Sequence, residues 1–356
     1  MNAKEPVRSK QELLARAAQG GLDGATIVGV DASGAVLRGV DFTGCVFEDC
    51  SLRGVDLRGA SLIRTRFDGT AFDGSHVGKA DFYEASLKGT TWSGAKLTDA
   101  DLTAVDLSSA KLEGATFDGA FLVDVDLTGA SLAGVDLSRA RVRTKKIAGA
   151  DLTGTKLLLA DLTGVDLRKC KVKGASFVQT LLANAQAKEV DFTDCVLERA
   201  SFDGADLERA RMPGLSAKQL RLRGAKLTQA SLARIVMPFA DARGATFDGA
   251  DLQDAILDSS LFDEASLRKV NLRSASLRGA HLLSADLSGS MLGKADFTNA
   301  DLSSANLEGA VLVDTTFEHA NLHKTRLANT EGSGAKMKGA KKTDASRAQA
   351  EEFRGE

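Results

Sequence analysis

The stretches Ala115-Thr116-Phe117-Asp118-Gly119 and Val125-Asp126-Leu127-Thr128-Gly129 share one five-residue pattern: small, polar, Leu or Phe, polar, Gly. We call the central Leu or Phe position i. From Ile27 to Leu327 this position recurs every five residues without an insertion, and 49 of its 61 occurrences are Leu or Phe. The i−2 positions are mostly Ala, Val, Ser, Thr or Cys, and 29 of the 35 glycines lie at i+2. The chain is therefore one long tandem repeat.

A period of five residues fits neither an α-helix nor a long strand. In an extended segment the side chains alternate, so residues i−2 and i face one side while residue i−1 faces the other. Glycine at i+2 allows the left-handed backbone of a tight turn. Because extended pieces and turns alternate, the chain must wind into coils that enclose the i and i−2 side chains.

This repeating unit resembles the pentapeptide repeat family over about residues 22–340. The resemblance implies an all-β solenoid, a right-handed quadrilateral β-helix with four units per coil and about 15 coils. We divide the chain into a leader with a capping helix over 1–21, the β-helix over 22–340 and a tail over 341–356, for which a helix is one candidate conformation. In relatives a C-terminal helix dimerises the solenoid, so the resemblance makes the tail a candidate homodimer contact.

The N-terminal leader contains a helix signal. The segment Ser9-Lys10-Gln11-Glu12 is typical of a capping box and predicts a short helix through Ala18. Leu13, Leu14 and Ala17 are candidates to cover the first coil. The first ten residues lack the apolar stretch of a signal peptide, and no apolar run reaches the length of a membrane span. We therefore expect a cytoplasmic protein that has no membrane partner.

Three places depart from the repeat. Lys145 occupies an i−2 position, which normally points into the core. Residues 211–220 and 233–240 place large apolar side chains where small ones belong, and they contain Pro213 and Pro238, which cannot donate ladder hydrogen bonds. We interpret all three places as local bulges or short loops.

The sequence offers no constellation typical of catalysis or metal binding. Many aspartates lie at i−1, where a convex solenoid provides no pocket for paired carboxylates. None of the four histidines lies directly one coil from another, and Cys45, Cys50, Cys170 and Cys195 all occupy i−2, the place of small core residues. We therefore expect no enzyme, no cofactor and no bound metal.

Charge is zoned along the chain although the formal net charge is only −2. Residues 97–138 and 241–264 are mainly acidic, whereas 139–173 and 209–240 are mainly basic. These zones are either ordinary solvated faces with pairs between coils or surfaces that recognise a partner. The basic zone 139–173 has no aromatic residue on which a base would stack, so we do not expect nucleic-acid binding.

Apolar residues in outward positions are the second surface feature. Residues at the same position of successive coils should be neighbours, so several of these side chains should form contiguous patches. Contiguous exposed apolar surface is typical of interfaces, although packing at the corners of the coil would place the same residues there. With the arginines and a lysine of the basic zone, the candidate interaction residues are Ile63, Tyr83, Arg139, Arg141, Arg143, Leu158, Leu159, Lys173, Val178, Leu181, Val236, Phe239 and Ile256.

Two functional hypotheses follow. The first is a non-catalytic scaffold that binds a protein partner; the leader Glu12-Leu13-Leu14-Ala15-Arg16, running straight into repeats, resembles that of pentapeptide proteins associated with bacterial type VI secretion. The alternative is a DNA mimic that protects or inhibits DNA gyrase, as some relatives do. Those relatives are strongly acidic, whereas basic zones interrupt the acidic ones in this chain.

Overall fold

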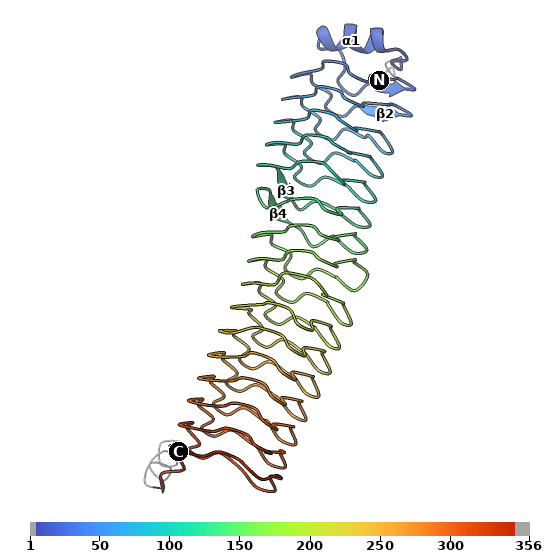
Figure 1. Ribbon diagram of the computed structural model, residues 1–356. Helices are drawn as coiled ribbons and strands as arrows, with labels where there is room; N and C mark the ends of the chain where they lie inside the picture. The colour runs from blue at the N-terminus through green and yellow to red at the C-terminus, as the bar shows by residue number, and fades with distance from the viewer. Residues whose placement is uncertain (1–4, 346–356) are drawn as a thin grey trace, which may run out of the picture. The chain divides into compact units, whose positions relative to one another are not determined.

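The computed structural model describes residues 5–345, and the chain divides into two compact units, Met1–Leu181 and Leu182–Glu356. In each unit the chain winds as stacked coils (Figure 1). Successive coils pair in parallel: in the first unit Asp41 is bridged to Ser61, and Ser61 is bridged in turn to Asp81. One coil therefore contains four of the five-residue repeats. Most of the predicted tail lies outside the described residues.

Regular secondary structure is sparse because each extended piece ends in a turn after a few residues. The described residues contain one helix and four strands, all in the first unit. Strands β1 and β2 pair in parallel, as do β3 and β4, and elsewhere in both units the coils meet mainly at single-residue parallel bridges. The elements are α1 (Lys10–Ala18), β1 (Thr26–Val28), β2 (Val46–Glu48), β3 (Phe121–Val123) and β4 (Arg141–Arg143).

The predicted leader helix is present as α1. Ser9 is its N-cap, and the Ser9 hydroxyl accepts the backbone N–H of Glu12 at 3.2 Å. Leu13 is fully buried, whereas Leu14 is 37% exposed. Only one of the two leucines therefore packs inside the first unit.

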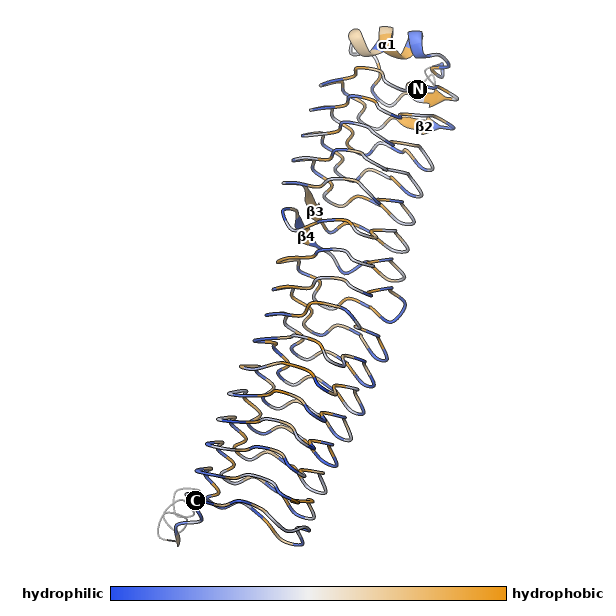
Figure 2. Cartoon of the chain, in the orientation of Figure 1, coloured by the Kyte–Doolittle hydropathy of each residue, from blue (hydrophilic) through white to orange (hydrophobic). Residues whose placement is uncertain are grey.

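The core of each unit is built from the i and i−2 side chains, which are buried in nearly every repeat. Hydrophobic residues recur along the coils of both units in Figure 2. Aromatic side chains stack where the same position is repeated one coil later: the ring centroids of Phe72 and Trp92 are 4.2 Å apart, and those of Phe297 and Phe317 are 5.3 Å apart. Stacking of like on like thus supplies the contact between neighbouring coils.

The backbone of each repeat uses its hydrogen bonds in a fixed way. In the repeat centred on Phe42, the N–H groups of Phe42 and Gly44 donate to the next coil, at 2.8 and 2.9 Å. The N–H of Cys45 closes a turn onto the carbonyl of Phe42 at 2.9 Å. The N–H at i+1, on Thr43, donates instead to the side chain of Asp41 at 2.9 Å. Aspartate is common at i−1 because it accepts this N–H.

This arrangement explains why the two predicted proline-containing bulges are wrong. Pro213 and Pro238 both occupy i+1, the position whose N–H makes no backbone hydrogen bond in the repeat. The following residues, Gly214 and Phe239, have positive φ, so each proline occupies the second position of a turn that favours it. Neither proline interrupts the coil.

The exchanged side-chain sizes in residues 211–220 do not disturb the coil either. Leu215 and Leu220 point inward at i−2 and are 7% and 1% exposed, with the small Ala217 buried at i. Ser216 still pairs with Val236, the residue at the same position of the next coil. A large residue at i−2 is accepted because a small one at i leaves the volume it needs.

The predicted bulge at Lys145 is confirmed. Lys145 is exposed, and Thr144 takes the buried place, with its hydroxyl donating to the carbonyl of Val125 at 2.5 Å. Asp161 pairs with Arg143 rather than with Arg141, the partner that the regular register would give it. A threonine hydroxyl is satisfied by one carbonyl, whereas a buried ammonium without a counter-charge costs several kcal/mol, so the register slips.

Candidate interaction surface

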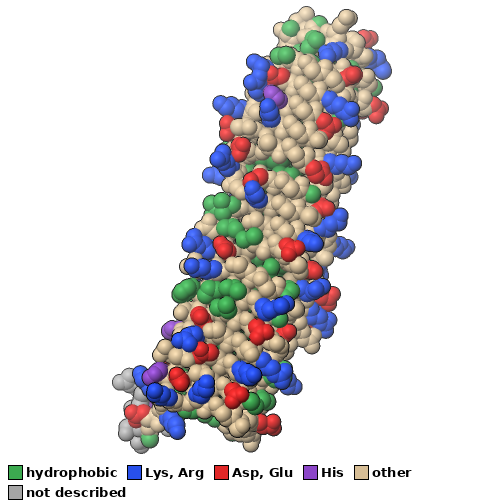
Figure 3. Space-filling view, viewed as in Figure 1, with side chains coloured by type: hydrophobic (Ala, Val, Ile, Leu, Met, Phe, Trp, Pro, Cys, Tyr) green, Lys and Arg blue, Asp and Glu red, His purple; other side chains and the backbone are tan. Residues whose placement is uncertain are grey.

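Two positions of the repeat face solvent, i−1 and i+1, and the i+2 position forms the corner. On the side of the molecule in Figure 3, hydrophobic side chains gather in patches between charged ones. The apolar candidates fall into three groups by their contacts, two in the first unit and one in the second. The basic candidates form a fourth group, in the first unit.

The first group, which we call the Leu159 patch, consists of Leu158, Leu159, Val178 and Leu181 in the first unit. Leu159 is 67% exposed and Leu181 is 46% exposed, whereas Leu158 and Val178 are half-buried. The backbone N–H of Leu159 donates to the carbonyl of Val178 at 3.3 Å, which joins the two coils. The predicted neighbours are therefore adjacent, and two of the four side chains are largely open to solvent.

The second group, the Phe239 patch, consists of Val236, Phe239 and Ile256 in the second unit. Val236 pairs with Ile256 across neighbouring coils, and Phe239 is 54% exposed. The ammonium of Lys218 lies 5.9 Å from the centroid of the Phe239 ring. This patch therefore has an aromatic centre beside a cation.

Leu159 and Phe239 share an unusual backbone conformation. Both occupy the i+2 corner, with φ of 60° and 59°. Left-handed backbone costs a non-glycine residue about 1–2 kcal/mol, and it is most unusual for bulky apolar side chains. Glycine fills this corner in many other repeats, so these two side chains are not needed to form the turn.

The third apolar group pairs Ile63 with Tyr83 in the first unit. The N–H of Arg64 donates to the carbonyl of Tyr83 at 2.9 Å, and Arg64 forms a 2.7 Å ion pair with Glu84. Tyr83 is 38% exposed, and a hydrogen bond to Glu84 raises its pKa above the ordinary value. Ile63 is half-buried, so Tyr83 carries most of the exposed surface of this pair.

The basic candidates are only partly available for a partner. Arg143 forms an ion pair with Asp124 at 3.2 Å, and Arg139 lies 4.0 Å from Asp118. Arg141 lies over the ring of Phe121, with 5.5 Å from its guanidinium carbon to the ring centroid. Lys173, the fourth basic candidate, is exposed.

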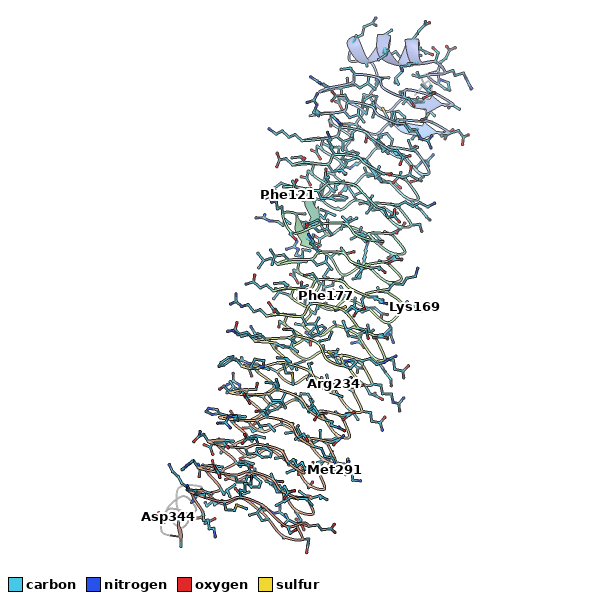
Figure 4. All side chains as sticks on the ribbon, viewed as in Figure 1. Phe121, Lys169, Phe177, Arg234, Met291 and Asp344 are labelled. Atoms are coloured by element: carbon cyan, nitrogen blue, oxygen red, sulfur yellow. The ribbon has the colours of Figure 1, made fainter. Side chains whose placement is uncertain are left out.

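Phe121 is an exposed residue that the sequence prediction missed. It lies in β3, is 40% exposed and is labelled in Figure 4. Val36, at the same repeat position, is 66% exposed. A search for every large apolar residue at i−1 would have found both.

Charges between coils pair as the spacing of one coil predicts. Lys146 lies 3.7 Å from Asp126, and Lys171 lies 3.1 Å from Asp151. Hydrogen bonds from Ser138 and from Lys156 on the next coil lower the pKa of Asp136 to about 2. Exposed pairs of this kind each add less than about 1 kcal/mol, so much of the charge zoning is internal pairing at little energetic gain.

The four cysteines fill the small places in the core. Cys45 and Cys195 are buried, and Cys50 and Cys170 are half-buried. The thiol of Cys45 donates to the carbonyl of Leu22 at 2.9 Å, and burial raises its pKa to about 11. Within residues 5–345, no group of three or more His, Cys, Asp or Glu side chains is arranged to hold a metal ion. No helix in the same part of the chain is long and apolar enough to cross a bilayer.

Solved structures of similar proteins include three that carry instructive names. A thylakoid-lumen pentapeptide repeat protein of Arabidopsis thaliana is 34% identical over 28% of this chain and 65% of its own, with a TM-score of 0.23. HetL of Nostoc sp. strain PCC 7120, a pentapeptide repeat protein involved in heterocyst differentiation regulation, is 24% identical over 93% and 95%, with a TM-score of 0.20. QnrB1, a plasmid-mediated fluoroquinolone resistance protein, is 18% identical over 68% and 96%, with a TM-score of 0.21.

These structural scores are too low to support an argument, and no curated protein matches the chain. The family model for pentapeptide repeats is the stronger finding. It matches residues 22–77, 80–143, 147–214 and 221–341, which is far more than half of the chain. Two of its gaps coincide with the bulge at Lys145 and with the exchanged side chains near Leu215. The chain belongs to the pentapeptide repeat family, whose fold is a right-handed β-helical solenoid.

Proposed function

We propose that the chain is a non-catalytic scaffold that binds a protein partner through the Leu159 patch and the Phe239 patch. One observation carries the proposal. Leu159 and Phe239 keep bulky apolar side chains on left-handed corners, exposed by 67% and 54%, where glycine would be less strained. Strain that does not serve the fold is characteristic of a binding surface.

The chemistry of the two patches suits a protein partner. Exposed Leu and Phe lose unfavourable contact with water when a partner covers them, and an aromatic ring beside a lysine adds a cation–π contact. The nearby Asp241 remains ionised down to low pH. Although partial burial opposes ionisation, hydrogen bonds from Arg243 and Arg223 lower the pKa of Asp241 to about 2. An apolar centre with a charged rim is the usual anatomy of a protein interface.

The test uses glycine substitutions, which remove the side chain without creating strain. We expect Leu159→Gly and Phe239→Gly to leave the fold as stable as before or more stable by up to about 1 kcal/mol. Both should lose a partner captured by affinity purification from the source organism. Arg234→Gly, at another exposed left-handed corner with φ of 60° (Figure 4), is the matched control and should keep the partner. Full retention of the partner by both patch variants would refute the proposal.

The biological process is a finer proposal. On the resemblance of the leader, we place this scaffold as an accessory protein of a bacterial type VI secretion system, acting in the cytoplasm. Co-purification with spike or effector components supports that placement, and their absence from a partner complex that is otherwise captured argues against it.

The gyrase alternative has a direct assay. A DNA mimic needs a continuous acidic surface, and this chain carries basic residues such as Arg211, Arg221 and Lys226 among its acidic zones. We therefore expect no effect of micromolar protein on DNA supercoiling by gyrase. Protection or inhibition in that assay would favour the alternative.

Several architectural details belong to the same proposal. We propose about 15 coils over residues 22–340 on the family's four-unit coil. We also propose that α1 covers the N-terminal end of the first unit, because Leu13 is buried there. The tail over 341–356 is the proposed dimer contact, and the oligomeric state of a chain truncated after residue 340 tests it.

A further inference from the structure

A hollow of about 410 Å³ opens on the surface of the first unit at the bulge. Its volume falls in the range of small-molecule sites. The walls come from three neighbouring coils, and the residues used below are Asp124, Arg143, Lys145, Lys146, Asp161 and Thr163. A smooth repeat would leave no such hollow, since every outward position would lie on a convex face.

The register slip creates the hollow. Because Thr144 takes the buried place, the side chain of Lys145 is turned out of the core and lies across the surface. Its Cε atom is 4.0 Å from the point where a Cβ on Gly164 would lie. The methylene chain of Lys145 thus forms an apolar wall, with its ammonium at the end.

Two of the cations in the hollow already have partners. Arg143 is paired with Asp124 at 3.2 Å, and Lys146 lies 3.7 Å from Asp126, which stands outside the hollow. Lys145, by contrast, forms no hydrogen bond or ion pair in the described part of the chain. The hollow therefore presents one ammonium that still needs a counter-charge.

The opposite wall presents a carboxylate in the same condition. Asp161 accepts the backbone N–H of Thr163 at 3.1 Å. Among residues 5–345 no lysine, arginine or histidine forms an ion pair with it. One unpaired ammonium and one unpaired carboxylate thus line the same hollow of about 410 Å³.

We propose that this hollow binds a small zwitterionic molecule whose carboxylate pairs with Lys145 and whose ammonium pairs with Asp161. A ligand with only a negative charge would meet Asp161, and one with only a positive charge would meet Lys145, so each would gain one contact and suffer one repulsion. A zwitterion of suitable length satisfies both walls. The inference does not depend on the proposed protein partner.

The first experiment compares three ligands with the same carbon chain length: 6-aminohexanoate, hexanoate and hexylamine. Binding to the full chain is measured by calorimetric titration or by chemical-shift changes. We expect the zwitterion to bind at least about tenfold more tightly than either singly charged ligand, which corresponds to about 1.4 kcal/mol. Equal affinity for all three ligands, or binding of none, overturns the proposal.

The second experiment separates the two walls. Lys145→Gln should abolish the preference for 6-aminohexanoate over hexylamine, because the carboxylate loses its counter-charge. Asp161→Asn should abolish the preference over hexanoate. Lys171→Gln and Asp151→Asn, which break a 3.1 Å pair outside the hollow, are the matched controls and should keep both preferences. Loss of binding in the controls, or retained preferences in the Lys145 and Asp161 variants, contradicts the assignment.

Discussion

The bulge around Lys145 and the regular coils around residues 211–220 and 233–240 look alike in sequence, since each breaks the pattern of small and large residues. In the structure they behave differently. The register slips at Lys145, where Asp161 pairs with Arg143, whereas the other two segments keep the regular pairing of one coil with the next. The pentapeptide coil tolerates exchanged volumes and proline at i+1, but it does not bury a lone charge.

The physical reason lies in what each change leaves unsatisfied. Leu215 and Ala217 exchange volume between two inward places, so the core remains filled. Pro213 removes an N–H that the backbone ladder does not use. A lysine at i−2 would leave an ammonium in the core without a partner, and no neighbouring side chain compensates for that.

The largest expected effect comes from placing a second lysine in a regular coil. Ala225 is fully buried at i−2, so Ala225→Lys should either destabilise the second unit by about 3–5 kcal/mol or force a new bulge. Denaturant unfolding measures the loss, and a crystal structure shows the register. Ala225→Ser is the control and should cost far less. If the lysine variant matched wild type in stability and register, burial of charge would not be the cause of the slip.

The next effect tests the exchange of volumes. Leu215→Ala restores the common small residue at i−2, yet it should cost about 2–5 kcal/mol because Ala217 leaves no large neighbour to fill the space. The double variant Leu215→Ala/Ala217→Leu should recover at least about 1 kcal/mol of that loss. Thermal unfolding of the single and double variants decides the matter. Additive losses would contradict the exchange.

A smaller effect is expected when the charge is removed from the bulge. Lys145→Ala should return the chain to the regular register, with Asp161 paired to Arg141, and raise stability by about 1 kcal/mol, the net value of a regained backbone hydrogen bond. The same change should close the hollow. Hydrogen exchange at Asp161 and a structure of the variant provide the measurement. A variant in which Asp161 still pairs with Arg143 would show that Thr144 alone holds the bulge.

The smallest effect belongs to proline. Pro213→Ala should lower stability by only about 0.4–1 kcal/mol, because the backbone loses no hydrogen bond and only the unfolded chain gains freedom. Equilibrium unfolding gives the value. A loss above about 2 kcal/mol would mean that the ring of Pro213 makes contacts on which the coil depends.

Much of the candidate surface could be predicted because outward positions follow from the period of the repeat. The neighbours Val236 and Ile256 were found in this way, and they pair as expected. Exposure could not be predicted, since Ile63 and Val178 have the same kind of position as Tyr83 but are half-buried by neighbouring side chains. The exposed Phe121 was missed although its i−1 position was available to the same search.

The sequence by itself determined the winding of the chain, because a period of five with small, large and glycine positions has one compact solution. It also determined which residues fill the core, including the four cysteines. Tertiary structure decided what happens where the pattern fails. Whether a large residue at i−2 fits depends on the volume left by the rest of the coil, and whether a charge leaves the core depends on partners one coil away, such as the carbonyl of Val125 that accepts Thr144.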